Sequence, residues 1–451
     1  MSGYAEYREV NLPWVKAVPA HWEIRRNKNI FTEQKEIVGE RSADYTLLSL
    51  TLNGIIPRDM DGGGKFPESF DKYKIVKNGD MAFCLFDIDE TPRTVGLSGY
   101  NGMLTGAYTI MRVSNINARF IYYYYLALDN GKMLRPLYTG LRKTININTF
   151  QSTKVPVPPR EEQDQIVRFL DWKVSSINKL INIKKKEIKA IDALKRSTVS
   201  HAITRGLTAD APMKYSGVKW LGDIPQRWYT VPLYAIAQVK SINNCIDLPL
   251  MSVYLDAGVV PFVEREEKRT NATSKDLTNY QRVDPGDFVL NNQQAWRGSV
   301  GVSFHSGIVS PAYIVLSLNN TLDSHYASYL FRSRCMVDQY LVISRGVGSI
   351  QRNLYWSALK RVVVPIPSKK EQMEIVEYLD GLNNKFDATI KKLTEEVAVL
   401  EEYKNKIIAD TVTGKIDVRG IEIPEYEFVD EDNDNVDENL EQGADEPPKE
   451  E

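Results

Sequence analysis

Hydrophobic residues that recur at intervals of three and four predict two long helices. Each predicted helix runs for about 45 residues without a proline and would be roughly 67 Å long. So narrow an apolar stripe is typical of a helix that pairs with another helix. The stripe of the first helix is interrupted by Lys184; its residues are Ile166, Leu170, Ile177, Ile181, Ile188, Ile191 and Leu194. The stripe of the second comprises Ile375, Leu379, Leu382, Phe386, Ile390, Leu393, Val397, Leu400, Tyr403 and Ile407.

The segments that open these helices are copies of each other. "VPVPPREEQDQIVRFLD" begins at Val155 and "VPIPSKKEQMEIVEYLD" begins at Val364, and nine of the 17 aligned residues are identical. Average composition predicts about one identity by chance. Both openings also carry helix-start signals, with Glu161 and Glu162 after Pro159 in one copy. The other copy places Glu371 three residues after Ser368, which is a capping box.

The regions before the helices repeat as well. "WVKAVPAHW" at Trp14 returns as "WLGDIPQRW" at Trp220, and "GDMAF" at Gly79 returns as "GDFVL" at Gly286. These regions show short β-rich runs separated by glycine and asparagine turns, with a few helices such as "RFIYYYYLAL". The tyrosines of that run could stack on bases, but we expect them to pack in a core. The predicted parts are a first α+β domain (1–154), a helical spacer (155–210), a second α+β domain (211–363), a second spacer (364–418) and a tail (419–451).

Chain connectivity favours antiparallel pairing of the two helices. Each α+β domain precedes its own helix, and the second domain follows closely on the end of the first helix. Antiparallel packing keeps every connection short, as connections prefer to be, whereas parallel packing would require a crossing of roughly 67 Å. The predicted fold class is therefore α+β: two similar domains separated by two long helices packed as an antiparallel coiled coil, with a pseudo-two-fold internal repeat.

The charge of the chain is divided unevenly. The net charge is −2, yet the residues after Gly420 contain fourteen acidic residues and one lysine. The remaining 420 residues therefore carry +11 (−2 minus −13), which permits a polyanionic partner. The acidic tail, poor in hydrophobic residues, is predicted to be disordered.

Sequence signals of catalysis, redox chemistry or membrane insertion are missing. "GGGKF" at Gly62 lacks the spacing of a phosphate-binding loop, and neither a [ND]PP[YF] motif nor a methyl-donor loop is found. Three cysteines without a CxxC pair and four scattered histidines suggest no disulfide framework or metal site. No apolar run approaches the roughly 18 residues of a membrane span, so a cytoplasmic location is expected. We predict no catalytic residue, cofactor site or metal site in this chain.

The duplicated blocks resemble the specificity subunit of Type I DNA restriction–modification enzymes. The resemblance rests on the twinned "VPxPxxxEQxxIVxxLD" blocks, on "LGDIPQRW" and on "SHAITRGL", and it covers the chain from Trp14 to about Ile416. It implies two target-recognition domains that read the halves of a split DNA sequence. It further implies helices that dock two adenine-N6 methyltransferase subunits, joined by motor-nuclease subunits. S-adenosylmethionine, ATP and magnesium would then belong to those partners. The acidic tail departs from the family pattern.

Base edges are read by forked donors and amides, so we expect the readers in loops that carry such side chains. Each could equally be a solvated loop residue or a turn former. The candidates are Arg93, Thr94, Arg142, Lys143, Asn146 and Asn148 in the first domain, and Asn292, Gln293, Arg297, Arg345, Gln351 and Arg352 in the second. Because these loops differ, we expect an asymmetric bipartite target. Candidates for binding the methyltransferase, or alternatively for fixing the helix entry, are Glu162, Gln163, Glu371 and Gln372.

Other interpretations stay open from the sequence. The complex could serve methylation only, the chain could be a purely structural coiled-coil adaptor, or it could be a nuclease that uses Glu266 and Lys268 of "EREEK". The lysines of "KKKEIK" at Lys184 could touch DNA phosphates, although a solvated helix face is the simpler expectation.

Overall fold

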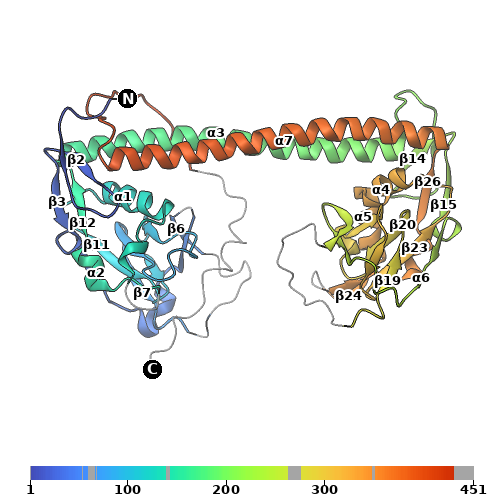
Figure 1. The fold of residues 1–451 in the computed structure, drawn as a ribbon, viewed down its shortest axis with the longest axis horizontal. Coiled ribbons are helices and arrows are strands. Elements are labelled where there is room, and N and C mark those ends of the chain that lie inside the picture. The colour runs from blue at the N-terminus through green and yellow to red at the C-terminus, as the bar shows by residue number, and fades with distance from the viewer. Residues whose placement is uncertain are drawn as a thin grey trace. The chain divides into compact units, whose positions relative to one another are not determined.

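The computed structural model describes residues 2–52, 54–58, 67, 69–138, 143–262, 276–347 and 351–430 of the chain. The chain forms two compact units (Figure 1). Unit 1 comprises Met1–Lys186 with Leu393–Glu451, and unit 2 comprises Glu187–Lys392. Two long helices, α3 (Arg160–Arg205) and α7 (Lys369–Val412), each contribute one part to unit 1 and the other part to unit 2.

The two long helices pair antiparallel within each unit, as predicted. In unit 1 the Lys404 ammonium donates to Asn178 at 3.2 Å, and Lys184 pairs with Glu396 at 2.5 Å. A later position of α3 thus meets an earlier position of α7. In unit 2 Lys195 pairs with Asp387 at 2.6 Å, and Gly206, just after α3, lies beside the Glu371 carboxylate.

Residues of both predicted apolar stripes pack between α3 and α7. Ile166, Ile177 and Ile181 of α3 share a buried cluster with Val397 and Ile407 of α7 in unit 1. Two stripe residues were predicted wrongly, because Leu194 and Tyr403 are 55% and 48% exposed.

Unit 1 is α+β, and its central sheet has the antiparallel order β4-β11-β8-β9. Asn117 caps α1 by accepting from the backbone N–H groups of Arg119 and Phe120. Helix α1 then buries Tyr124 and Tyr125, so this part of the tyrosine run packs in the core as expected. The elements before α3 are β1 (Tyr7–Glu9), β2 (Ala17–Pro19), β3 (Glu23–Arg26), β4 (Phe31–Gln34), β5 (Leu48–Thr51), β6 (Gly54–Pro57), β7 (Lys74–Val76), β8 (Asp80–Phe83), β9 (Val95–Leu97), β10 (Gly102–Leu104), β11 (Thr109–Val113), α1 (Ala118–Asn130), α2 (Ile147–Ser152) and β12 (Lys154–Val157).

Unit 2 repeats this topology with the sheet order β16-β23-β20-β21. Asp323 caps α4 as Asn117 caps α1. Unit 2 also contains helix α5 and the hairpin β24-β25. The elements between the long helices are β13 (Met213–Tyr215), β14 (Asp223–Pro225), β15 (Tyr229–Pro232), β16 (Ala237–Val239), β17 (Met251–Tyr254), β18 (Gly258–Pro261), β19 (Gln281–Val283), β20 (Asp287–Asn291), β21 (Val300–Val302), β22 (Gly307–Val309), β23 (Tyr313–Leu318), α4 (Ser324–Arg332), α5 (Arg334–Ile343), β24 (Arg345–Val347), β25 (Gln351–Asn353), α6 (Trp356–Leu359) and β26 (Val363–Ile366).

Each long helix follows a strand that belongs to a separate two-stranded sheet of the preceding α+β domain. Strand β12 pairs with β3 in unit 1, and β26 pairs with β15 in unit 2. The "VPxP" sequences, which we assigned to the helical spacers at 155–210 and 364–418, therefore lie largely within the α+β domains.

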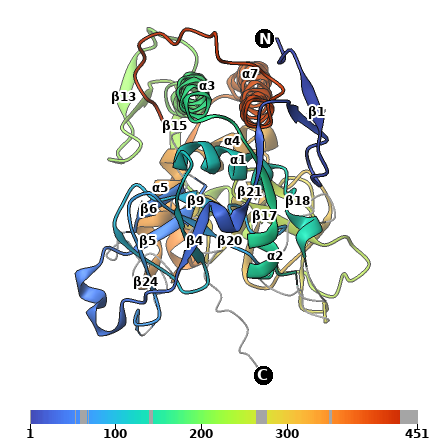
Figure 2. The same ribbon diagram turned by 90° about the vertical axis from the view of Figure 1, so that its left-hand side faces the viewer.

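The N-terminal residues and the segment after α7 pack together in unit 1 (Figure 2). The N–H of Asp417 donates to the carbonyl of Ser2, and the Tyr7 hydroxyl donates to the carbonyl of Gly414. We call residues 417–430 the C-terminal strap. Its Ile421 and Ile423 pack against the core of unit 1. The prediction that disorder begins at residue 419 is wrong for 419–430, while residues 431–451 lie outside the described residues.

Within the described ranges, no helix is both long and apolar enough to cross a membrane.

Candidate nucleic-acid interface

Two turns at matching positions of the two sheets carry many of the predicted DNA readers. In unit 1 the turn between β8 and β9 contains Arg93 and Thr94. In unit 2 the turn between β20 and β21 contains Asn292, Gln293 and Arg297. Loops held by a rigid sheet are common sites of recognition. Because the two turns occupy matching positions, their side chains can be compared directly.

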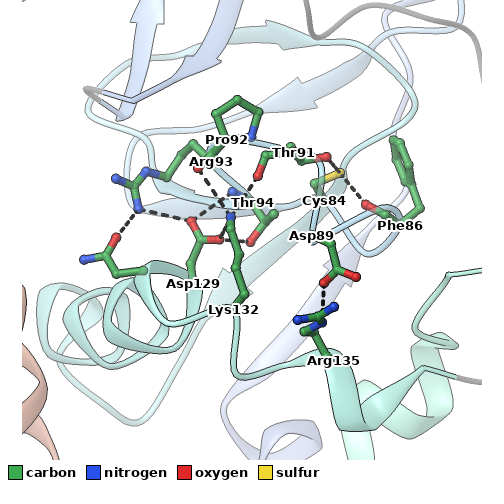
Figure 3. Close-up of polar contacts among 11 residues, drawn as sticks. Cys84, Phe86, Asp89, Thr91, Pro92, Arg93, Thr94, Asp129, Lys132 and Arg135 are labelled. Atoms are coloured by element: carbon green, nitrogen blue, oxygen red, sulfur yellow. Dashed lines mark hydrogen bonds and ion pairs between the residues drawn. The ribbon is translucent and has the colours of Figure 1, made fainter. Parts of the chain in front are cut away.

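The unit 1 turn is held by one buried carboxylate at the end of α1, Asp129 (Figure 3). Asp129 is 1% exposed and accepts from Thr94 twice, through the backbone N–H at 3.0 Å and the hydroxyl at 2.6 Å. It also pairs with the Arg93 guanidinium at 3.1 Å and the Lys132 ammonium at 2.8 Å. Asn130 accepts a further hydrogen bond from Arg93 at 2.8 Å. The turn is therefore fixed to α1 by a charged network.

This network changes the assignment of two predicted readers. Thr94 is 1% exposed and its hydroxyl is bound by Asp129, so its assignment as a base reader is wrong. Its role is to anchor the turn. The Arg93 guanidinium is mostly buried and is held by Asp129 and Asn130, so it also braces the turn.

Two acidic side chains of the unit 1 turn, Asp89 and Glu90, pair with basic side chains from neighbouring segments. Arg135 pairs with Asp89 at 2.8 Å, and Lys143 pairs with Glu90 at 2.6 Å. The hydrogen bond between Lys143 and Glu90 raises the pKa of Lys143 and lowers the pKa of Glu90. Burial raises the pKa of the Cys84 thiol, which donates to the carbonyl of Phe86 (Figure 3). Because Arg135 and Lys143 are paired with carboxylates, this region offers DNA less net positive charge than the two basic side chains would alone.

The remaining unit 1 candidates lie near the start of α2. Asn146 is exposed and caps α2 by accepting from the backbone N–H of Asn148, which is exposed too. Arg142 lies outside the described residues. The exposed amides of Asn146 and Asn148 are at the protein surface, where base contact stays a prediction.

The unit 2 turn has a different chemistry, built on an aromatic ring. Trp296 lies in a short 3-10 helix (Ala295–Arg297) and donates through its ring N–H to the carbonyl of Gln293 at 2.9 Å. The guanidinium of Arg297 lies over its ring at 4.7 Å, and that of Arg352 lies 5.9 Å from the ring centre. Such contacts fix the plane of a guanidinium without using its hydrogen-bond donors.

The hairpin β24-β25 brings more predicted readers to the same place. The N–H of Leu354, directly after β25, donates to the carbonyl of Asn292 at 2.9 Å. Arg345 pairs with Asn353 in the hairpin register and is exposed. The side chain of Gln351 lies outside the described residues. The structure thus gathers Gln293, Arg297 and Arg352, predicted from separate segments, around Trp296, and we call these four residues the tryptophan–arginine surface. Asn292 is next to them, but its side-chain oxygen is buried.

The first "EQ" block is buried and does not form a partner-binding surface. Glu162 accepts from the Tyr4 hydroxyl at 2.5 Å and from the Trp22 ring N–H at 2.9 Å, and it contacts His21 at 2.7 Å. Burial and the bond to Glu162 raise the pKa of Tyr4. Gln163 donates to the carbonyl of Pro158 at 2.8 Å.

The second block repeats this arrangement. Arg227 donates to both oxygens of Glu371, at 2.7 and 3.1 Å, which raises the pKa of Arg227. Gln372 donates to the carbonyl of Pro367, and its side-chain oxygen accepts from the cap of α4, Asp323. Of the two roles left open, fixing the helix entry therefore accounts for Glu162, Gln163, Glu371 and Gln372. Their assignment as partner-binding residues is wrong, because all four side chains are buried.

Comparison with known proteins decides the family. The family model described as "Type I restriction modification DNA specificity domain" matches residues 70–191 and 225–399, which is more than half of the chain. The chain belongs to this family. The two matched segments follow the internal repeat, one in each half of the sequence.

Individual relatives match this chain over nearly its whole length. The chain is 24% identical over 441 residues to the Type I restriction enzyme MjaVIII specificity subunit of Methanocaldococcus jannaschii, covering 92% of this chain and 98% of that protein. It is 25% identical, with the same coverage, to the MjaX specificity subunit of that organism. A solved chain from a study of assembly and conformational transition of the type I R-M system shares the fold. Its TM-score is 0.58 at 14% identity, covering 88% of this chain and 99% of that one.

The sequence analysis missed two residues that organise the two turns, Asp129 and Trp296. Asp129 carried a usable signal, since a carboxylate in the last turn of a helix is unfavourable for the helix dipole and so suggests another role. Trp296 also carried one, as a large aromatic ring in a polar turn. Glu266 and Lys268, the basis of the nuclease alternative, lie outside the described residues.

Proposed function

We propose that this chain is the DNA-reading subunit of a Type I restriction–modification complex and recognises an asymmetric bipartite target. Each α+β unit reads one block of the target. Membership of the DNA specificity family supports this role. The asymmetry of the target is inferred from the contrast between the two turns. They occupy matching positions of similar sheets, but the arginine of one is held by a carboxylate and that of the other lies over a tryptophan ring.

The tryptophan–arginine surface is suited to direct base reading. An arginine can donate two hydrogen bonds to the major-groove edge of guanine, and glutamine or asparagine can bind adenine in a similar way. Stacking on Trp296 would hold the guanidinium of Arg297 in a fixed plane, which reduces the entropy lost on binding. In unit 1 the exposed amides of Asn146 and Asn148 are the better candidates, because Arg93 is engaged by Asp129.

The chain acts with partners in this proposal. Two methyltransferase subunits and motor-nuclease subunits would supply the chemistry, with S-adenosylmethionine, ATP and magnesium bound to them. The helix entries are tied to the α+β units through buried Glu162 and Glu371. The partner surfaces would then lie on exposed parts of α3 and α7. A complex that methylates without a nuclease subunit is the alternative within the same family.

Mapping methylated adenines tests the proposal. In cells that carry this chain and its methyltransferase, we expect one motif with two unlike blocks separated by unspecified bases. Cells in which this chain alone is deleted serve as the control and should lose methylation at that motif. A single continuous motif, or methylation that persists in the control, would contradict the proposal.

A further inference from the structure

Three side chains connect the unit 1 turn to helix α7. The Arg93 guanidinium donates to Oδ1 of Asn130 at 2.8 Å, and Nδ2 of Asn130 donates to Oδ1 of Asn405 at 2.7 Å. Asn130 is the last residue of α1, and Asn405 lies about two turns before the end of α7. We call Arg93, Asn130 and Asn405 the asparagine relay. Through it, the turn is tied to the helix pair of unit 1.

The asparagine relay lines a pocket of about 570 Å³ that is bordered by α1, α3, α7 and the C-terminal strap. Interiors without such a space are close-packed, and the packing itself then fixes the distance between neighbouring elements. Because side chains do not fill this pocket, packing fixes the end of α1 against α7 less tightly there. The hydrogen bonds of the relay, which run along the wall of the pocket, therefore gain importance for the position of the turn.

The earlier part of α1 is fixed to the helix pair in a way that both units share. The Tyr123 hydroxyl donates to Asp171 of α3 at 2.7 Å. In unit 2 the Tyr329 hydroxyl of α4 donates to Asp380 of α7 at 2.5 Å. Asp171 and Asp380 are matched by the alignment of the duplicated blocks. This contact therefore belongs to the shared fold.

The asparagine relay, in contrast, is a feature of unit 1 alone among the described parts of the two units. The alignment of the duplicated blocks matches Asn405 with Arg196 of α3, which pairs with Asp192 of its own helix at 2.7 Å. The sequence "RTVG" of the unit 1 turn matches "GSVG" in unit 2, so Arg93 matches Gly298, which has no side chain. The relay is therefore not required by the shared fold.

The predicted readers of unit 1 are attached to the same turn. The N–H of Ile145 donates to the carbonyl of Leu85, within the turn, at 2.7 Å. Helix α2 follows directly, with the exposed amides of Asn146 and Asn148 at its start. A shift of the turn relative to α7 would consequently shift these amides as well.

We propose that Asn405 is a positioning residue that fixes the place of the unit 1 readers on the helix pair. It thereby limits the number of unread base pairs that the complex accepts between the two blocks of its target. Asp129 determines the shape of the turn, whereas Asn405 determines its place. Loss of the relay leaves base discrimination within each block intact but lets the unit 1 readers shift along the DNA. The inference rests on the proposed DNA-reading function.

Binding of Asn405→Ala to duplexes with altered gaps tests the inference. The complex with the methyltransferase subunits is measured on the target and on duplexes with one base pair inserted into, or removed from, the gap between the blocks. The ratio of the two dissociation constants, altered gap over natural gap, is the gap penalty. We expect the gap penalty to fall roughly two- to tenfold, the range of one hydrogen bond. Discrimination against single base substitutions in either block should stay as in the wild type.

Three further variants provide the controls. Asn405→Asp keeps an acceptor oxygen for Asn130 and should retain the wild-type gap penalty. Arg196→Ala changes the matching, exposed position of α3 and should also leave the gap penalty unchanged. Asn130→Ala should lower the gap penalty, and its combination with Asn405→Ala should lower it no further, because both changes break the same relay.

An unchanged gap penalty in Asn405→Ala would overturn the inference. An equal loss of affinity on every duplex would overturn it too, since it indicates a purely structural role, and so would a lowered gap penalty in Asn405→Asp. The proposed function fails separately if the wild-type complex does not prefer the split target to unrelated DNA.

Discussion

Replacing Asp129 by alanine is expected to destabilise unit 1 by about 3 kcal/mol, because it leaves two largely buried cations and a buried hydroxyl without their acceptor. Asp129 is 1% exposed, and the side chains of Arg93 and Lys132 that it neutralises are mostly buried as well. Amide hydrogen exchange of strand β9, which begins at Val95, measures the opening free energy of this part of unit 1.

Two variants sharpen that measurement. Asp129→Asn keeps an acceptor for Thr94 but removes the charge, so its loss should be intermediate. Glu90→Ala removes a solvent-exposed partner of Lys143 from the same turn and should leave β9 protected as in the wild type. Wild-type protection in Asp129→Ala would show that the turn does not depend on this carboxylate.

The second large effect is expected at the tryptophan–arginine surface. Arg297→Ala should reduce discrimination at one base pair of one block by about 1–3 kcal/mol, or roughly 5- to 150-fold, if Arg297 donates to a base edge. Trp296→Ala should reduce discrimination at the same base pair, since it removes the ring that orients Arg297. Trp296→Phe retains an aromatic face and should restore part of the discrimination. The measurement is binding of the methyltransferase complex to target duplexes that carry each single base substitution.

The other block of the target and an unrelated arginine provide the controls. Arg334→Ala removes an exposed arginine of unit 2 that pairs with Asp338, and it should leave discrimination unchanged. A uniform loss of affinity on all sequences in Arg297→Ala would indicate a phosphate contact and would contradict base reading.

The fold was largely predictable from the sequence, because its signals are local or repeated. The apolar stripes gave both helices and their pairing, and the duplicated blocks gave two similar α+β domains. Leu194 and Tyr403 were misplaced because a spacing of three and four shows which residues share a helix face, but not which of them the partner helix covers.

The site was less predictable, since its contacts join distant segments. Thr94 looked like an exposed loop residue, and only its contact with Asp129, 35 positions away, shows its structural role. The strap was missed for a different reason. Composition averaged over the whole acidic tail hides the spaced apolar residues Ile421 and Ile423, which pack its first part against the core of unit 1.

Replacing residues 211–366, which include the whole of β26, by the corresponding segment of a relative with a different target tests the central claim that the two units read independently. After the exchange, we expect the map of methylated adenines to show one block of the motif changed to that of the donor and the other block unchanged. Alteration of both blocks, or an unchanged motif, would contradict the account.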